Sequence, residues 1–300
     1  MAKFRYSDKK LGAPKLRTIE TANVIVDEYA AQGFDLTLRQ LYYQMVARDH
    51  IENSEHSYKN FGNAIRDGRL AGLIDWERIV DRTRNLRKNG HWRNPADIIE
   101  RAADSYATDK WATQPNRIEV WVEKEAATGV IETVCGRLDV PFFACKGYNS
   151  LSEAWAAGTR LKGYCDRGQT PVILYMGDHD PSGMDMTRNV AASLERFAGE
   201  HITVTRIALN FDQIQQYNPP PQPAKVGDKR AAGYIAKYGG SSWELDALNP
   251  SIVARLIETH VGKYLDSKAW ATAIAIEDEG RELLQLAARH WGTVAEHLQN

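Results

Sequence analysis

Apolar residues near the start of the chain recur three and four positions apart, which is the spacing of helices that bury one face. The stretch 17–32, RTIETANVIVDEYAAQ, is predicted to be a helix that ends before Gly33, because glycine is favoured directly after a helix. A second helix follows Thr37, a residue type that caps helices well, and extends to about Asp49. These patterns predict that the chain opens with a helical module.

A third helix is predicted from Ser54 onward and contains YKNFGNAIRDGRLAG (58–72). The segment that follows it, LIDWERIVD (73–81), has the apolar and β-branched content of a short strand or wing. Helix, turn, helix and strand in this order favour a winged-helix module. In such modules the later helix normally enters the major groove of DNA.

The pattern changes about a third of the way along the chain, where short apolar runs alternate with helix-like stretches. NPADIIERAADSYA (94–107) is predicted to be a connecting helix, and RIEVWVEKE (117–125), PVILYMGDHD (171–180) and ITVTRIAL (202–209) are predicted to contain strands. Buried strands that alternate with helices are typical of a parallel sheet in an α/β domain. NPPPQP (218–223) can be neither helix nor central strand. Two amphipathic helices are predicted beyond it, IVARLIETHVGKYL (252–265) and IEDEGRELLQLAARHWGTVAEHL (276–298).

Length and composition set the domain organisation. The 300 residues are 43% hydrophobic and 26% charged, which is enough for two globular domains. We predict a basic arm (1–16), a winged-helix, CAP-like domain (17–108) and an α/β domain with C-terminal helices (109–300). The N-terminus lacks an apolar signal core and no stretch approaches about eighteen uninterrupted apolar residues, so a cytoplasmic protein without membrane contacts is expected. Three cysteines lack metal-site or even disulfide spacing, and reduced thiols are expected at Cys135, Cys145 and Cys165.

The net charge is −1, but basic residues concentrate in the first hundred positions. The segment 1–17 contains six Lys or Arg and one acid, and the segment 78–93 again contains six and one. Clustered basic residues favour a DNA partner. For either segment taken alone, an ordinary solvated loop is the alternative.

Three acids follow the ends of two predicted strands. Asp178 and Asp180 end one strand, and side chains two positions apart in an extended chain face the same way. Glu123 ends another, and the carboxyl ends of parallel strands meet at one edge. Carboxylates crowded at one point repel each other unless a divalent cation lies between them, which favours magnesium or manganese. A solvated turn or a helix N-cap is the alternative, and His179 is expected to pack rather than to bind metal.

Motifs at this edge resemble the Toprim domain of the topoisomerase VI A subunit and of related meiotic double-strand-break proteins. They are VEKEA (122–126), KGY (146–148) and DHDPSG (178–183). RQLYY (39–43) resembles the tyrosine-bearing DNA-cleavage domain of the same proteins. The domain order is also the same, and the resemblance covers roughly residues 35–215.

The resemblance implies a winged helix followed by a Toprim domain, with Glu123, Asp178 and Asp180 as magnesium ligands. It also implies that the tyrosine of R-x-x-x-Y attacks a DNA phosphate and leaves a 5′-phosphotyrosyl link. The family further implies a homodimer, in which the tyrosine of one subunit meets the metal site of the other. The chain departs from the family after KGY, where Asn149 and Ser150 replace the usual Pro and Asp. It also contains no P-loop motif, so strand passage of the topoisomerase VI kind would require a separate ATPase subunit.

Helical phase separates the two tyrosines of TLRQLYYQM. Tyr42 falls on an apolar stripe with Leu41 and Met45, so it belongs to the core. Tyr43 lies off that stripe and four residues after Arg39, which makes the two neighbours on a helix. A phenol has a pKa of about 10 and is scarcely ionised at neutral pH. The arginine can lower that pKa, hold the scissile phosphate, or both, so Tyr43 and Arg39 are the predicted catalytic residues.

The leading interpretation is magnesium-dependent cleavage of DNA by tyrosine transesterification. Two alternatives remain open at this point: a Toprim nuclease that cuts by water attack within a DNA-defence complex, and a DNA-binding component without chemistry. Basic side chains on the third helix and wing are the candidates for phosphate contacts, together with the lysine of KGY. These predicted DNA-binding residues are Lys59, Arg66, Arg69, Arg82, Arg84 and Lys146.

Overall fold

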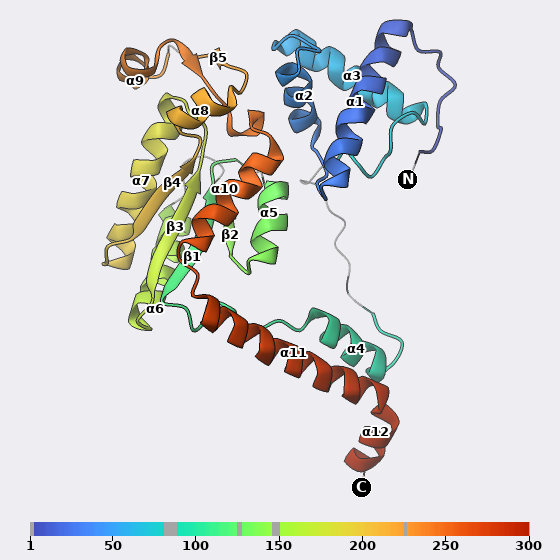
Figure 1. Cartoon of the computed structure of the whole chain (residues 1–300), viewed down its shortest axis with the longest axis vertical. Coiled ribbons are helices and arrows are strands. Elements are labelled where there is room, and N and C mark those ends of the chain that lie inside the picture. The colour runs from blue at the N-terminus through green and yellow to red at the C-terminus, as the bar shows by residue number, and fades with distance from the viewer. Residues whose placement is uncertain are drawn as a thin grey trace.

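The computed structural model describes residues 3–80, 89, 91–124, 128–145, 151–224 and 227–299. Within these ranges the chain is α/β, with a four-stranded parallel sheet and helices before, between and after the strands (Figure 1). Predicted sites at Arg82, Arg84 and Lys146 lie outside the described residues. The α/β class and the parallel sheet predicted from the sequence are confirmed.

Three helices open the chain, and local sequence signals explain where they begin. α1 (Ala13–Ala31) carries Pro14 in its first turn, and Gly33 just beyond its end has a φ of 83°. The predicted helices after Thr37 and Ser54 are confirmed. In α2 (Leu38–Ala47) Thr37 and Gln40 form a capping box, and in α3 (Glu55–Leu70) the Ser54 hydroxyl accepts the backbone N–H of Ser57.

The predicted strand after α3 is wrong for the described residues 73–80. Ile79 makes a single parallel bridge with Leu36, and the rest of the segment forms turns. The guanidinium of Arg69 explains this, because it donates to the carbonyls of Trp76, at 2.9 Å, and of Ile79. A side chain therefore satisfies carbonyls that a neighbouring strand would otherwise pair with.

The parallel sheet lies in the second half of the chain. β1 (Asn116–Val122) and β3 (Thr170–Met176) form its centre, flanked by β2 (Phe142–Ala144) and β4 (Thr203–Ala208), in the order β2-β1-β3-β4. β1 and β3 pair in register from Asn116 with Thr170 to Val122 with Met176. Their carboxyl ends consequently lie side by side.

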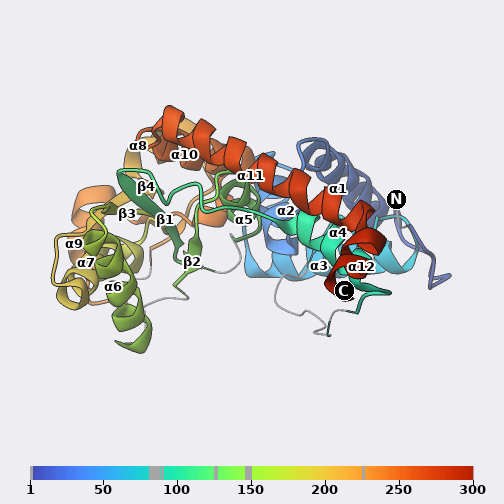
Figure 2. The ribbon, with the colours of Figure 1, turned by 90° about the horizontal axis from the view of Figure 1, so that it is seen from below.

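Helices cover both faces of the sheet (Figure 2). Alternate strand residues such as Val120 and Leu174 pack with α5 (Thr128–Arg137) and α10 (Pro250–Gly262). The intervening residues, including Trp121, Ile173 and Tyr175, pack with α6 (Leu151–Asp166) and α7 (Pro181–Ala198) on the opposite face. Both faces are buried, as expected for a parallel sheet.

A segment that we call the strap, described over residues 218–224 and 227–247, runs from the sheet to the N-terminal helices. It follows α8 (Phe211–Tyr217) and contains α9 (Ala231–Tyr238). NPPPQP is neither helix nor central strand, as predicted, because only β5 (Gln222–Pro223) within it pairs, antiparallel to β6 (Ser241–Ser242). The short helix η2 (Leu245–Ala247) ends the strap, and its Ala247 packs in the core of the N-terminal helices.

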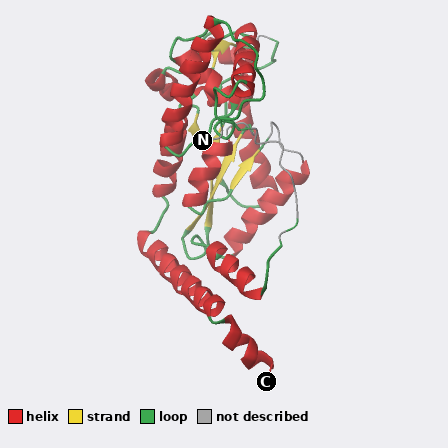
Figure 3. Cartoon of the chain, turned by 90° about the vertical axis from the view of Figure 1, so that its right-hand side faces the viewer, coloured by secondary structure: helices red, strands yellow, loops and turns green. Residues whose placement is uncertain are grey.

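The C-terminal helices form an arm that leads away from the sheet (Figure 3). α11 (Ser267–Arg289) is followed by α12 (Trp291–Gln299), and α4 (Pro95–Ser105) packs along α11. The helix predicted over 252–265 is confirmed by α10, whereas the one predicted over 276–298 is divided at His290 between α11 and α12. The domain boundary at residue 108 stays a prediction. Within the described ranges, no helix has the length and apolar character needed to cross a bilayer.

Candidate functional site

The carboxyl ends of β1 and β3 bring Glu123 to Asp178, as the sequence predicted. Glu123 Oε2 accepts the backbone N–H of Asp178 at 2.9 Å. Asp178 Oδ1 accepts the N–H of Leu245 from the strap at 2.9 Å, and its Oδ2 pairs with the Lys124 ammonium. We call this group of side chains the acid edge.

Asp180 lies at the acid edge and also caps a helix. Its Oδ1 accepts the N–H of Gly183 at 2.6 Å, so it is the N-cap of α7. The N-cap alternative considered for the Asp pair is therefore real for Asp180. Its charge still acts on its neighbour, because both Asp178 and Asp180 contribute to the raised pKa of Glu123.

Two glycines, Gly177 and Gly183, allow the backbone to pack closely against the carboxylates of the acid edge. A Cβ at Gly177 would lie 2.7 Å from Glu123 Oε2, and a Cβ at Gly183 would lie 2.3 Å from the carbonyl oxygen of Asp178. At Gly183 the clash would be with backbone, so only glycine fits there, whereas a side chain at Gly177 would displace the Glu123 carboxylate. Gly177 and the DHDPSG motif that follows it thus allow β3 and α7 to approach Glu123 closely.

A buried guanidinium holds the backbone of this loop. Arg206 of β4 donates to the carbonyls of Gly177 at 2.8 Å, Asp178 at 2.6 Å and Gly183 at 3.1 Å. Burial lowers the pKa of Arg206, while Tyr175 and the acids raise it in part. Arg206 therefore fixes the backbone from which the acids project. Sequence analysis missed it because it lies within an otherwise ordinary strand.

His179 packs, as predicted. It is fully buried, and its ring contacts Phe211, Tyr234, Tyr238 and Trp243 at centroid distances of 4.6 to 5.8 Å. Its Nδ1 lies 2.7 Å from the Tyr234 hydroxyl. Its backbone N–H and C=O both pair with Trp243, so His179 fastens the strap to the acid edge.

The electrostatics of the acid edge show an excess of negative charge. Burial, followed by Asp178, raises the pKa of Glu123 to about 7. Burial also raises the pKa of Asp178, although Lys124 acts against it. Asp246 of the strap adds a further carboxyl: burial, then Asp178, raises its pKa to about 6, and neither of its side-chain oxygens has a hydrogen-bond partner.

These donors fit a hard divalent cation in their chemistry and location. They are carboxylates that share one edge, and the orphaned oxygens of Asp246 show that the local charge is not balanced by the chain itself. Their oxygens do not converge as a preformed site, since no three His, Cys, Asp or Glu in the described ranges are arranged to hold an ion. Lys124 instead supplies positive charge to Asp178.

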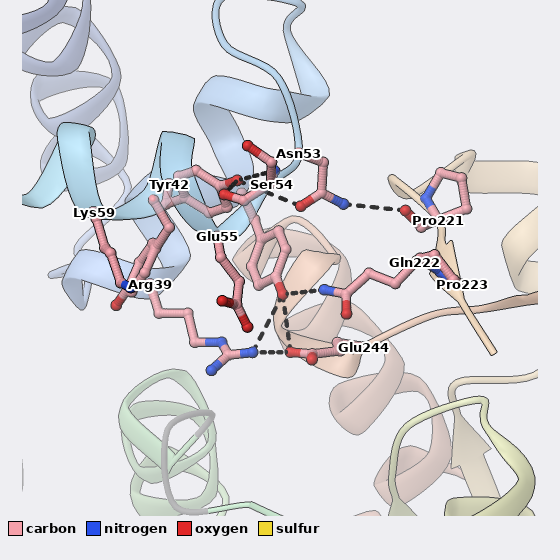
Figure 4. A pocket seen from close by; sticks show the side chains of 12 residues that line it. Arg39, Tyr42, Asn53, Ser54, Glu55, Lys59, Pro221, Gln222, Pro223 and Glu244 are labelled. Carbon is pink, nitrogen blue, oxygen red and sulfur yellow. Dashed lines mark hydrogen bonds and ion pairs between the residues drawn. The ribbon is translucent and has the colours of Figure 1, made fainter. Parts of the chain in front are cut away.

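The second part of the site surrounds Tyr43. Its hydroxyl donates to Glu244 Oε2 at 3.0 Å and accepts from Gln222 Nε2 at 2.6 Å and from Arg39 at 3.3 Å. Arg39 also pairs with Glu244 Oε2 at 2.6 Å. Figure 4 shows the labelled side chains of Arg39, Gln222 and Glu244 turned toward one point. The predicted neighbours Arg39 and Tyr43 are thus in contact.

Both tyrosines of α2 are buried, at 4% and 2% exposure, but their hydroxyls have different roles. The Tyr42 hydroxyl accepts the N–H of Ser54 at 2.9 Å and lies 3.1 Å from the carbonyl of Glu52, so it anchors the start of α3. Both tyrosines line a cavity of about 620 Å³ between α2, α3 and the strap, and the Tyr43 hydroxyl contacts Gln222 and Glu244 of the strap. The prediction that Tyr43 lies off the core face is wrong, because its ring packs in the same buried cluster as Tyr42.

One expectation about Tyr43 is wrong in this structure. Arg39 does act to lower the phenol pKa, but burial and the charge of Glu244 outweigh it and raise the pKa to about 12. The sequence did not reveal Glu244 and Gln222 because they lie 201 and 179 residues after Tyr43, on the strap. Of the two, only Glu244 had a local sequence pattern that could have indicated a site, because Asp246 follows it two residues later in WELD (243–246).

Glu244 also connects the two parts of the site. Its Oε2 lies 3.8 Å from the Lys124 ammonium, which pairs with Asp178. Tyr43 and the acid edge are therefore joined by consecutive polar contacts within one chain. The family resemblance implied instead that these groups meet across a dimer.

The predicted DNA-binding residues differ in their surroundings. Lys59 lines the cavity beside Tyr43 and is exposed, and Arg66 is exposed with a 3.5 Å contact to Asp67. Arg69 is half-buried, lies over the Trp76 ring at 5.2 Å and donates to backbone carbonyls. We therefore retain Lys59 and Arg66 as candidates and leave Arg69 out, since its donors serve its own chain.

Comparisons with known proteins add no assignment. The chain matched no family model, no curated protein and no solved structure.

Proposed function

We propose that this protein cleaves DNA by transesterification at Tyr43, with magnesium or manganese held by Glu123, Asp178 and Asp180. The observation that carries the proposal is the continuous polar connection from the Tyr43 hydroxyl through Glu244 and Lys124 to Asp178. The resemblance of DHDPSG, VEKEA and RQLYY to the winged-helix and Toprim cleavage enzymes supports it independently of the geometry.

In the proposed reaction the Tyr43 oxygen gives its proton to water and forms a bond to phosphorus. The bond from phosphorus to the 3′ oxygen breaks, and the departing oxygen takes up a proton, which leaves a 5′-phosphotyrosyl link. Arg39 would hold a non-bridging phosphate oxygen through its guanidinium. When bound, the metal would stabilise negative charge on the phosphoryl group. Lys59 and Arg66 would contact neighbouring phosphates without reading sequence.

A homodimer and a separate ATPase subunit remain parts of the proposal that rest on the resemblance alone. Each chain carries its own tyrosine and acid edge, so a double-strand break would need two chains, one for each strand. Joining the ends again would use the energy kept in the phosphotyrosyl bond.

The deciding experiment is to trap a covalent protein–DNA adduct. The protein is incubated with supercoiled DNA in magnesium or manganese, denatured, and analysed for DNA bound to protein. We expect an adduct with the wild type that is lost in Tyr43→Phe and kept in the matched control Tyr42→Phe. Asp178→Ala should also lose it.

Two other outcomes would contradict the proposal. Cleavage that persists in Tyr43→Phe but stops in Asp178→Ala would make water the nucleophile. DNA binding without cleavage under every metal tested would leave a binding protein.

A further inference from the structure

Three polar groups converge on a single oxygen of Glu244. Oε2 accepts from the Arg39 guanidinium at 2.6 Å and from the Tyr43 hydroxyl at 3.0 Å, and the Lys124 ammonium lies 3.8 Å away. The three donors come from α2 and from the end of β1, which are far apart in the sequence. Two cations and a hydroxyl around one anionic oxygen are also what a phosphate oxygen requires.

The same contacts block Tyr43. A phenol oxygen has one proton to donate and two lone pairs to offer. The proton is given to Glu244, while Gln222 and Arg39 donate toward the oxygen at 2.6 and 3.3 Å. With its proton retained and hydrogen-bonded to Glu244 and both of its lone pairs engaged, the oxygen is a poor nucleophile, so this arrangement is a resting one.

Glu244 is placed by its neighbours in the chain. Trp243 exchanges two backbone hydrogen bonds with His179, at 2.8 and 3.0 Å, and the N–H of Leu245 binds Asp178. The backbone on both sides of Glu244 is thus tied to the acid edge. Its side chain reaches from there toward α2.

A role for Glu244 as proton acceptor is less consistent with its surroundings. Burial acts to raise the pKa of Glu244, but Lys124 and Arg39 outweigh burial and leave that pKa below its ordinary value. The pKa of its proton donor, Tyr43, is about 12. Transfer of the phenol proton to such a weak base is strongly uphill.

We propose that Arg39 and Lys124 form a binding site for a phosphate of the DNA backbone, and that the carboxylate of Glu244 occupies this site in the free protein. DNA and Glu244 then compete for the same two cations. The proposal rests on the proposed function for its ligand, DNA, but it does not require that Tyr43 react.

The test measures binding in a Tyr43→Phe background without divalent metal, using a fluorescent DNA duplex. Glu244→Gln keeps the shape of the side chain and removes its negative charge from beside both cations, while Lys124 keeps its ion pair with Asp178. We expect it to tighten binding about five- to tenfold at low salt, and to steepen the salt dependence by about one phosphate contact. Replacing Arg39 or Lys124 by Ala in that double variant should remove the gain.

Glu55→Gln is the matched control. Glu55 lines the same cavity and is exposed, and in the described part of the chain it is not among the ion-pair partners of Arg39 or Lys124. Glu55→Gln removes the same charge as Glu244→Gln, but it does so from an exposed carboxylate that solvent screens. It should therefore change affinity less than about twofold and leave the salt slope unchanged. Thermal unfolding of each variant checks that the fold is retained.

Equal gains in the two Gln variants, or no gain in Glu244→Gln, would overturn the proposal. Tighter binding without any covalent adduct in the Tyr43-containing protein would keep the phosphate site and reject transesterification. A covalent adduct in the Tyr43-containing protein, with no change in affinity in Glu244→Gln, would support transesterification and reject the phosphate site.

Discussion

The acid edge and the surroundings of Tyr43 are built in different ways. At the acid edge, the side chains are placed by strand ends, by a helix N-cap and by two glycines, Gly177 just before DHDPSG and Gly183 within it. Around Tyr43, the partners Gln222 and Glu244 come from the strap, and only Arg39 is a sequence neighbour. The comparison teaches that the first region forms where two adjacent strands end, so the sheet brings its residues together, whereas the second depends on a connection that crosses from the sheet to the N-terminal helices.

The largest expected effect tests the rigidity of the acid edge. Gly183→Ala places a Cβ 2.3 Å from the carbonyl oxygen of Asp178, and both groups are backbone-bound. We expect the free energy of unfolding to fall by about 3 kcal/mol, since neither can move without displacing α7. Denaturant unfolding measures it.

Gly136→Ala is the control for that substitution, because this helical glycine is exposed and its added Cβ would meet nothing within 4 Å. It should be neutral or stabilise by up to about 1 kcal/mol. Similar small effects at Gly183 and Gly136 would mean that the acid edge is plastic.

A second prediction concerns the strap carboxyl Asp246, which belongs to neither region by sequence. Its folded pKa of about 6 lies above the ordinary value, so the folded state binds a proton more readily than the unfolded state. Its contribution therefore favours folding at low pH and is lost as pH rises from about 4 to 6. Asp246→Asn removes this loss.

We expect Asp246→Asn to become more stable than the wild type by about 2 kcal/mol as pH rises to 7, with chelator present. Denaturant unfolding at a series of pH values measures the difference. The exposed Asp212→Asn provides the baseline. A difference that does not vary with pH would show that the Asp246 carboxyl is balanced by a partner in solution.

The smallest expected effect concerns the contact between the strap and Tyr43. Gln222→Ala removes a 2.6 Å hydrogen bond to the Tyr43 hydroxyl and should lower the free energy of unfolding by about 1 kcal/mol. Gln215→Ala, at an exposed position of α8, should change it by less than about 0.5 kcal/mol. Equal effects would show that the strap is not held at Tyr43.

Sequence patterns predicted what local chemistry controls. Thr37 and Ser54 marked the starts of α2 and α3, and acids after apolar runs marked the ends of β1 and β3. The strand expected after α3 failed because Arg69 satisfies carbonyls there, and a helix pattern does not show that its arginine turns inward.

For the candidate site too, the sequence predicted the contacts that local geometry sets and missed those that depend on the strap. Glu123 and Asp178 meet because parallel strand ends meet, and Arg39 contacts Tyr43 because four residues make a helical turn. Glu244 could not be placed, since its position depends on how the strap crosses to α2. The pKa of Tyr43 is raised first by burial and second by the charge of Glu244, which the strap brings to α2.

The backbone hydrogen bonds on either side of Glu244 determine how large a motion is needed to exchange its carboxylate for a phosphate at Arg39 and Lys124. Because Trp243 and Leu245 stay tied to His179 and Asp178, a phosphate can replace the Glu244 carboxylate by rotation of one side chain. Rotation of one side chain is a smaller and faster motion than the separation of two domains. For the proposed phosphate site we therefore expect the rate of DNA capture to depend on diffusion and charge, with the carboxylate lowering affinity without delaying the encounter.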